Sequence, residues 1–116
     1  LIVDDSASMR QMVNFTLSEE GYEVTEAENG QGALDSMKGG APDLVITDIN
    51  MPVMGGIELI KQVRSAADFK FTPIIVLTTE SEESKQNEGK QAGATAWLVK
   101  PFTPEKLIET VKKVAG

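Results

Sequence analysis

The stretch Leu44-Val45-Ile46-Thr47-Asp48 is an apolar run that ends in a carboxylate. It has the length of a strand, and its continuous hydrophobicity predicts a strand that is covered on both faces. Residues 73–77 repeat this signal. Buried strands of this kind occur in parallel sheets whose two faces are covered by helices. The stretch therefore predicts the centre of an α/β protein.

Five strand-helix units can be counted outward from this centre. The expected strands are residues 1–3, 22–27, 44–47, 73–77 and 96–99. Four of the segments that follow them carry apolar residues at helical spacing, namely Met9, Met12, Val13 and Leu17; Ala33, Leu34 and Met37; Ile57, Ile60, Val63 and Ala67; and Leu107, Ile108, Val111 and Val114. Residues 81–91 have almost no apolar face and contain Gly89, so we expect a marginal and mobile helix there. Five units predict a flavodoxin-like (βα)5 three-layer sandwich with a parallel five-stranded sheet of order 2-1-3-4-5.

Length, composition and charge narrow the class of protein. The 116 residues fit one domain, which we expect to span residues 1–116 with a first strand that lacks its leading residues. The 18 acidic and 11 basic side chains give a formal net charge of -7, so direct binding of nucleic acid is not expected. The chain has no histidine and no cysteine, which excludes histidine-based triads and thiolate metal sites. No apolar run approaches the roughly 20 residues that span a bilayer, and we expect a monomeric cytoplasmic protein without membrane insertion.

Polar side chains follow four of the predicted strands. They are Asp4 and Asp5 after the first strand, Asp48 after the third, Thr78 after the fourth and Lys100 after the fifth. Ligands of open α/β sheets bind at the carboxyl ends of strands, where the strand order reverses. Two charges about 4 Å apart repel by about 4 kcal/mol at an effective dielectric of about 20, so three crowded carboxylates take up protons or hold a cation. Mg²⁺ prefers such oxygen ligands, and with the Lys100 ammonium it would balance the three negative charges.

Four segments of the chain carry a resemblance to a known family. They are Val-Asp-Asp-Ser at 3–6, Asp-Ile-Asn-Met-Pro-Val-Met-Gly-Gly at 48–56, Leu-Thr-Thr at 77–79 and Lys-Pro-Phe-Thr at 100–103. Each is weak alone, but together and in this order they are highly specific. Across essentially the whole chain, the sequence resembles the response regulator receiver domains of two-component systems. The resemblance implies a phosphorylation-activated switch rather than an enzyme, in which Asp48 accepts a phosphoryl group from a histidine kinase.

The resemblance also assigns roles around Asp48. It implies that Mg²⁺ is held by Asp4, Asp5, Asp48 and the backbone carbonyl of Asn50, and that the chain assists its own phosphorylation and dephosphorylation. Lys100 would neutralise phosphoryl charge, with a cis peptide bond before the proline at position 101 to aim it. Thr78 would donate its hydroxyl to the phosphoryl group, and Trp97 matches an aromatic switch position. The output surface would be the fourth helix, the fifth strand and the fifth helix.

Several other interpretations stay open at this point. Asp4-Asp5-Ser6 is also a common strand-end turn with a helix N-cap, and Trp97 is also a plausible half-buried packing residue. A flavodoxin-like cofactor module would need a phosphate loop rich in Ser, Thr and Gly, where Asp4-Asp5 would repel phosphate. An aspartyl-phosphate hydrolase would need a second Asp at position 6, which is Ser.

Two interpretations within the receiver family differ in whether the domain acts alone or as part of a larger protein. The Asn-Met-Pro-x-Met loop at 50–54 and the Thr-Thr-Glu-Ser segment at 78–81 are similar to single-domain chemotaxis members. That similarity implies a downstream protein target such as a flagellar motor switch. The alternative is a receiver domain taken from a larger response regulator or a hybrid kinase.

Overall fold

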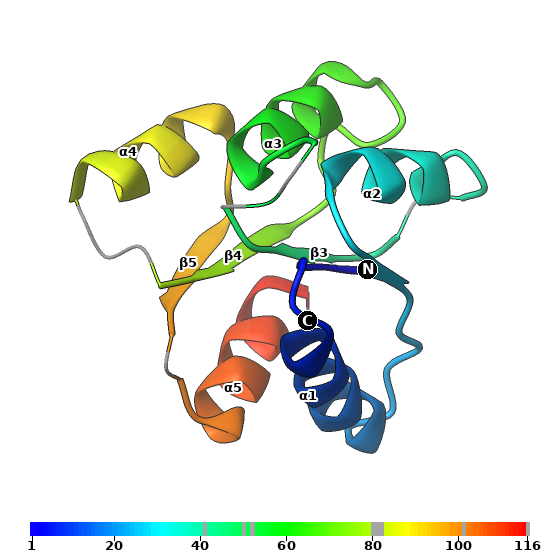
Figure 1. The fold of residues 1–116 in the computed structure, drawn as a ribbon, viewed down its shortest axis with the longest axis vertical. Helices are drawn as coiled ribbons and strands as arrows, with labels where there is room; N and C mark the ends of the chain where they lie inside the picture. The colour runs from blue at the N-terminus through cyan, green and yellow to red at the C-terminus, as the bar shows by residue number, and fades with distance from the viewer. Residues whose placement is uncertain (41, 50, 52, 80–82, 101, 116) are drawn as a thin grey trace.

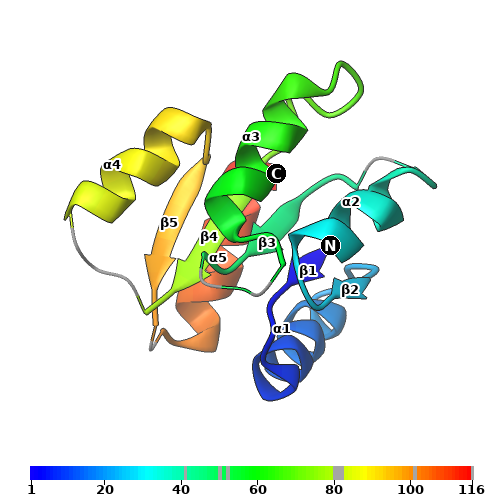
Figure 2. The ribbon, with the colours of Figure 1, turned by 45° about the horizontal axis from the view of Figure 1, so that its top comes forward.

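The computed structural model of the chain describes residues 1–40, 42–49, 51, 53–79, 83–100 and 102–115. Its core is a parallel five-stranded sheet of order β2-β1-β3-β4-β5 (Figure 2). The strands are β1 (Ile2–Val3), β2 (Glu26–Ala27), β3 (Val45–Thr47), β4 (Ile74–Thr78) and β5 (Ala96–Val99). Every residue of β3 and β4 is buried, as their continuous hydrophobicity predicts. The predicted fold class and strand order are confirmed.

Five helices complete the three layers. They are α1 (Ala7–Glu19), α2 (Gly30–Met37), α3 (Gly56–Ser65), α4 (Glu83–Ala92) and α5 (Pro104–Ala115). Helices α1 and α5 cover one face of the sheet, and α2, α3 and α4 cover the other (Figure 1). No helix in the described part of the chain combines the length and the hydrophobicity that crossing a bilayer would require.

Alternate residues of β1, β3, β4 and β5 contribute to two apolar cores, because successive strand side chains point to opposite faces. On the face of α2 and α3, Ile74 and Val76 of β4 pack with Ile60 and Val63 of α3. On the face of α1 and α5, the core unites Val13, Leu17, Ile75, Leu77, Leu107 and Val111. The sheet is therefore a rigid support whose carboxyl edge presents the loops.

Two expected boundaries differ from the structure by two or more residues, while β1, β3 and β4 differ from their expected ranges by one residue at one or both ends. The second strand covers Glu26–Ala27 rather than 22–27, and its two residues pair with Ile2 and Val3 of β1. The third helix ends at Ser65, where Ala66 turns to an extended backbone with φ -86° and ψ 127°. Ala67 therefore lies outside the helix and is exposed, instead of extending its apolar face. The expected mobility of the fourth helix stays a prediction.

Candidate functional site

Strand order brings three carboxylates to one place. Because β1 and β3 are neighbours, with Val3 opposite Thr47, the residues that follow them lie side by side. The Asp48 amide donates to the carbonyl oxygen of Val3 at 2.9 Å. Asp4, Asp5 and Asp48 each offer a carboxylate oxygen, and these oxygens lie within 4.8 Å of one another. Asp4 is buried, Asp5 is exposed and Asp48 is half-buried, so the crevice is closed on one side and open on the other.

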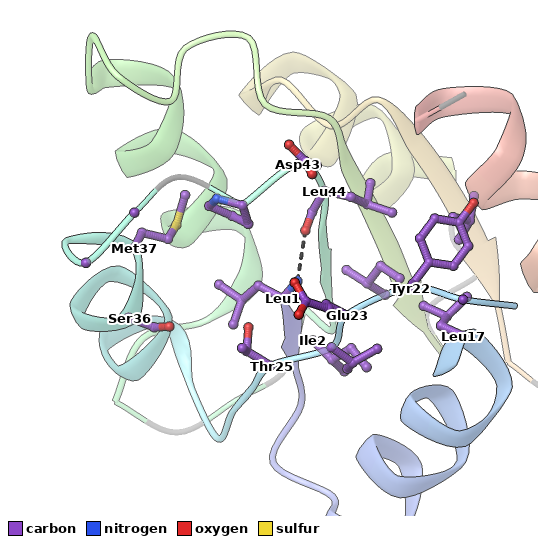
Figure 3. Close-up of a pocket in the computed structure, with 17 residues that line it drawn as sticks. Leu1, Ile2, Leu17, Tyr22, Glu23, Thr25, Ser36, Met37, Asp43 and Leu44 are labelled. Carbon is purple, nitrogen blue, oxygen red and sulfur yellow. Dashed lines mark hydrogen bonds between the residues drawn. The ribbon is translucent and has the colours of Figure 1, made fainter. Parts of the chain in front are cut away.

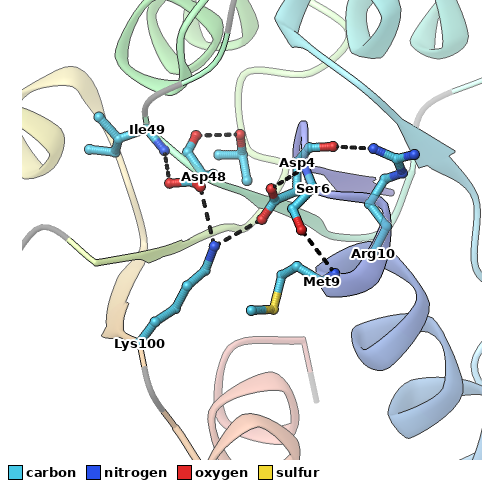
Figure 4. Close-up of polar contacts among 8 residues, drawn as sticks. Asp4, Ser6, Met9, Arg10, Asp48, Ile49 and Lys100 are labelled. Atoms are coloured by element: carbon cyan, nitrogen blue, oxygen red, sulfur yellow. Dashed lines mark hydrogen bonds and ion pairs between the residues drawn. The ribbon is translucent and has the colours of Figure 1, made fainter.

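Lys100 closes the crevice from the end of β5. Its Nζ lies 3.0 Å from Asp4 Oδ2 and 3.2 Å from Asp48 Oδ2, so the ammonium bridges the two carboxylates (Figure 4). The Lys100 side chain is only 12% exposed. Burial by itself lowers the pKa of Lys100, but the hydrogen bond that its ammonium donates to Asp4 and the charges of Asp4 and Asp48 outweigh it. The pKa of Lys100 therefore lies above its ordinary value, and the ammonium stays charged at neutral pH.

Backbone amides fix the remaining carboxylate oxygens. Ser6 N donates to Asp4 Oδ1 at 2.9 Å, and Ile49 N donates to Asp48 Oδ1 at 2.6 Å (Figure 4). Ser6 is also the N-cap of α1, where its hydroxyl accepts from Met9 N at 3.3 Å. The N-cap interpretation of this segment is thus correct. It is compatible with a metal site, because the cap uses the side chain of Ser6, whereas the Asp4 carboxylate is held by the backbone amide of Ser6.

Arg10 is a neighbour of the site that the sequence reasoning missed. Its Nε lies 3.1 Å from Glu26 Oε1, and its Nη1 donates to the backbone carbonyl of Asp4. It therefore ties α1 to β2 and holds the backbone of a candidate ligand. Nothing local in the sequence indicates this pairing, since residues 10 and 26 meet only through the strand order.

The loop that leaves Asp48 depends on two glycines. A methyl group at Gly56 would overlap the Asp48 carbonyl, and one at Gly55 would lie 2.9 Å from the carbonyl oxygen of Ile49. The Gly56 amide donates to that oxygen at 2.9 Å. In the sequence these glycines were part of the segment at 48–56 that resembles the receiver family, and the structure shows that they let the helix start close to Asp48.

The two expected switch residues share one face of the sheet. Thr78 is fully buried at the end of β4, two residues after Val76, which faces α3. Trp97 is the register partner of Val76, and its half-buried side chain packs against the same core. Asn50 and the proline at position 101 lie outside the described residues, so the carbonyl ligand and the cis bond stay predictions.

The donor set fits a hard divalent cation. Mg²⁺ binds oxygen at about 2.0–2.1 Å, so ligands on opposite sides of the ion lie about 4.2 Å apart. The 4.8 Å limit on the three carboxylate oxygens is close to that span. Three carboxylates and one ammonium leave two net negative charges, which one divalent cation would neutralise.

A cavity of about 930 Å³ lies near the amino ends of the strands, whereas the acidic crevice lies at their carboxyl ends. Leu1, Tyr22, Met37, Asp43 and Leu44 are among the residues that line it (Figure 3). The amino terminus of Leu1 donates to the carbonyl oxygen of Leu44 there at 2.9 Å. The cavity brings together none of the candidate site residues, so it is not part of the acidic crevice.

Known proteins are similar to this chain over nearly its whole length. The family described as response regulator receiver domain matches residues 1–112. Chemotaxis protein CheY1 of Helicobacter pylori is 46% identical over 118 residues, with 100% of this chain and 95% of the relative covered. The structure of Vibrio cholerae chemotaxis protein CheY4 is 52% identical with a TM-score of 0.93, covering 97% of this chain and 94% of that chain. Transcriptional regulatory protein ResD of Bacillus subtilis is 39% identical over 112 residues, covering 97% of this chain and 45% of ResD.

Proposed function

The chain belongs to the response regulator receiver domain family, and on that basis we propose that Asp48 accepts a phosphoryl group from a histidine kinase and thereby switches the protein. The likeness to chemotaxis proteins over the full chain supports a role in chemotaxis. The single observation that carries the proposal is the crevice itself. Its three carboxylate oxygens lie within 4.8 Å of one another, beside the Lys100 ammonium.

Accessibility and position favour Asp48 as the acceptor. The Asp4 side chain is 4% exposed and that of Asp48 is 13% exposed, so Asp48 is the more open of the two carboxylates bound to Lys100. One Asp48 oxygen would form a bond to phosphorus while the bond from phosphorus to the imidazole nitrogen of the donor breaks. The electron pair leaves with the imidazole, which then takes up a proton. Asp5 is exposed, which suits a metal ligand at the open side of the crevice.

Mg²⁺ is the cofactor that the donor set supports, with Asp4, Asp5, Asp48 and the Asn50 carbonyl as its ligands. When bound, the ion would supply neutralisation of the charge on the transferring phosphoryl oxygens. Lys100 already contacts an Asp48 oxygen, so its ammonium is in place beside the new phosphoryl group. Catalysis of this kind is mostly positioning, which is how a protein that is not an enzyme can assist its own phosphorylation and dephosphorylation.

The signal would leave the site through Thr78 and Trp97. Phosphorylation would replace the single carboxylate charge of Asp48 with a charge of about -1.5 to -2 and would add new acceptor oxygens. The Thr78 hydroxyl would donate a hydrogen bond to one of them. Trp97 would respond on the same face, and α4, β5 and α5 would form the surface that binds a downstream protein. For a chemotaxis protein, that target would be the flagellar motor switch. A receiver within a longer regulator is the second candidate, supported by the match to 45% of ResD.

Incubation with a small acyl phosphate and Mg²⁺, followed by intact-mass measurement, tests the acceptor. We expect one phosphoryl adduct in the wild type and none in Asp48→Asn, and no adduct when a chelator removes the metal. Asp43→Asn is the matched control, because Asp43 is an exposed carboxylate at the opposite edge of the sheet, and its adduct should form as in the wild type. An adduct that persists in Asp48→Asn would show that another residue is the acceptor.

A further inference from the structure

Helix α4 is attached to the body with very little apolar surface of its own. Among its residues whose side chains the structure describes, Gly89 is the one buried position. Glu88, Lys90 and Gln91 around it are exposed, and Ala92 is half-buried. A helix normally docks through a stripe of apolar side chains, so something else must hold α4.

The indole ring of Trp97 lies directly against α4 at Gly89. A methyl group at Gly89 would lie 2.5 Å from Trp97 Cζ3 and 3.1 Å from Cε3. It would also lie 3.6 Å from Ile57 Cδ1, so the ring is next to both α3 and α4. Alanine is a much better helix former than glycine, so this glycine weakens α4 as a helix while it admits the ring.

We propose that the indole of Trp97 is the support on which α4 rests, and that Gly89 is the positioning residue that allows this contact. Trp97 shares its face of the sheet with Thr78, whose predicted movement toward a phosphoryl group would open space for the ring. A ring that moves toward Thr78 would leave α4 without this contact. The signalling role of this contact rests on the proposed function; the contact itself does not.

A second contact anchors α4 just beyond its C-terminal end. At its C-terminal end, Arg64 Nε of α3 donates to the carbonyl oxygen of Gly93 at 3.0 Å. A shift of the Trp97 ring leaves that hydrogen bond intact. When the Trp97 ring moves away, α4 would therefore pivot about its C-terminal end, and the whole helix would not detach.

A stability cycle tests the contact without any phosphodonor. In the wild type, Gly89→Ala should lower the urea midpoint, because the new methyl group displaces the ring. In a Trp97→Ala background the same change should raise the midpoint, because only the helix preference for alanine remains. Gly32→Ala in α2 is the control, since its methyl group would meet atoms no closer than 3.6 Å. The same sign of change in both backgrounds would overturn the proposal.

Fluorescence follows the ring itself, because Trp97 is the one tryptophan of the chain. We expect Gly89→Ala to shift the emission to longer wavelength and to increase quenching by acrylamide, with Gly32→Ala like the wild type. Unchanged emission in Gly89→Ala would overturn the contact, whether or not Asp48 is phosphorylated.

A second arm adds a small acyl phosphate with Mg²⁺. In wild-type protein that carries the adduct by mass, the quenching of Trp97 should change. An adduct with unchanged quenching would overturn the coupling and leave the proposed function standing. Absence of the adduct would overturn the proposed function, and with it the signalling role of the contact.

Discussion

The two helices next to β5 in the chain, α4 and α5, are held in opposite ways, on opposite faces of the sheet (Figure 1). Helix α5 buries its own Leu107 and Val111 completely in the core. Helix α4 rests through Gly89 on Trp97, a side chain of β5. A helix that supplies its own apolar contacts is fixed as long as the core is intact. A helix that rests on the ring of a neighbouring strand can pivot when that ring moves, while the core stays intact.

The largest effect should come from α5. Leu107→Ala removes a fully buried side chain and should lower the free energy of unfolding by about 2–5 kcal/mol. Gln91→Ala on the exposed face of α4 is the matched change and should stay within about 0.5 kcal/mol. Urea unfolding measures both. Similar costs at the two positions would break the contrast between the helices.

Arg64 tests the fixed end of α4. Its guanidinium donates to the carbonyl oxygens of Thr72 at 2.7 Å, Gly93 at 3.0 Å and Lys70 at 3.1 Å. Arg64→Met keeps much of the aliphatic stem but leaves these carbonyls without the cation, which should cost about 2 kcal/mol of unfolding free energy. Lys61→Met on the exposed face of the same helix should change little. An equally small cost for Arg64→Met would mean that α4 is not anchored at this end.

Lys100 tests whether β5 is anchored at its carboxyl end. Its pKa is raised in the folded state, so its ammonium contributes stability below its unfolded pKa of about 10.4, and this is lost as pH rises through the folded pKa. Lys100→Met should therefore cost about 1–2 kcal/mol at neutral pH, and the difference from wild type should shrink above about pH 10.4. Urea midpoints across this range measure it. A difference independent of pH would contradict the assigned ion pairs.

The smallest effect concerns the loop that leads into α3. Val53 is 84% exposed and has a φ of 69°, a left-handed conformation that a β-branched residue rarely adopts. Val53→Asn should raise the free energy of unfolding by about 0.5–1 kcal/mol, because asparagine tolerates this conformation. Val53→Thr keeps the branch and should not stabilise. Equal values for the two variants would exclude backbone strain as the cause.

Much of the fold and of the crevice could be predicted from the sequence. Continuous apolar runs indicated β3 and β4, and the count of strand-helix units indicated the strand order. Because carboxyl ends of parallel strands meet at one edge, that order placed Asp4, Asp5, Asp48 and Lys100 together before any distance was known.

What the sequence left out depends on contacts between distant residues. Arg10 reaches the Asp4 backbone and Glu26 only in the folded sheet. In the sequence, Gly89 indicated only a weak helix. Hydrophobic periodicity describes the side chains of the helix itself, so it could not show that the Trp97 ring packs against the helix backbone. The extent of β2 depends on its pairing with β1, which the alternation of residues 22–27 does not encode.

The most direct test compares hydrogen exchange in α4 and α5 before and after treatment with a small acyl phosphate and Mg²⁺. We expect the adduct-bearing wild type to exchange faster in α4 while exchange in α5 is unchanged, and we expect Asp48→Asn to show no change in either helix. An adduct on Asp48 with unchanged exchange in α4, or with a change in α5 instead, would contradict this expectation.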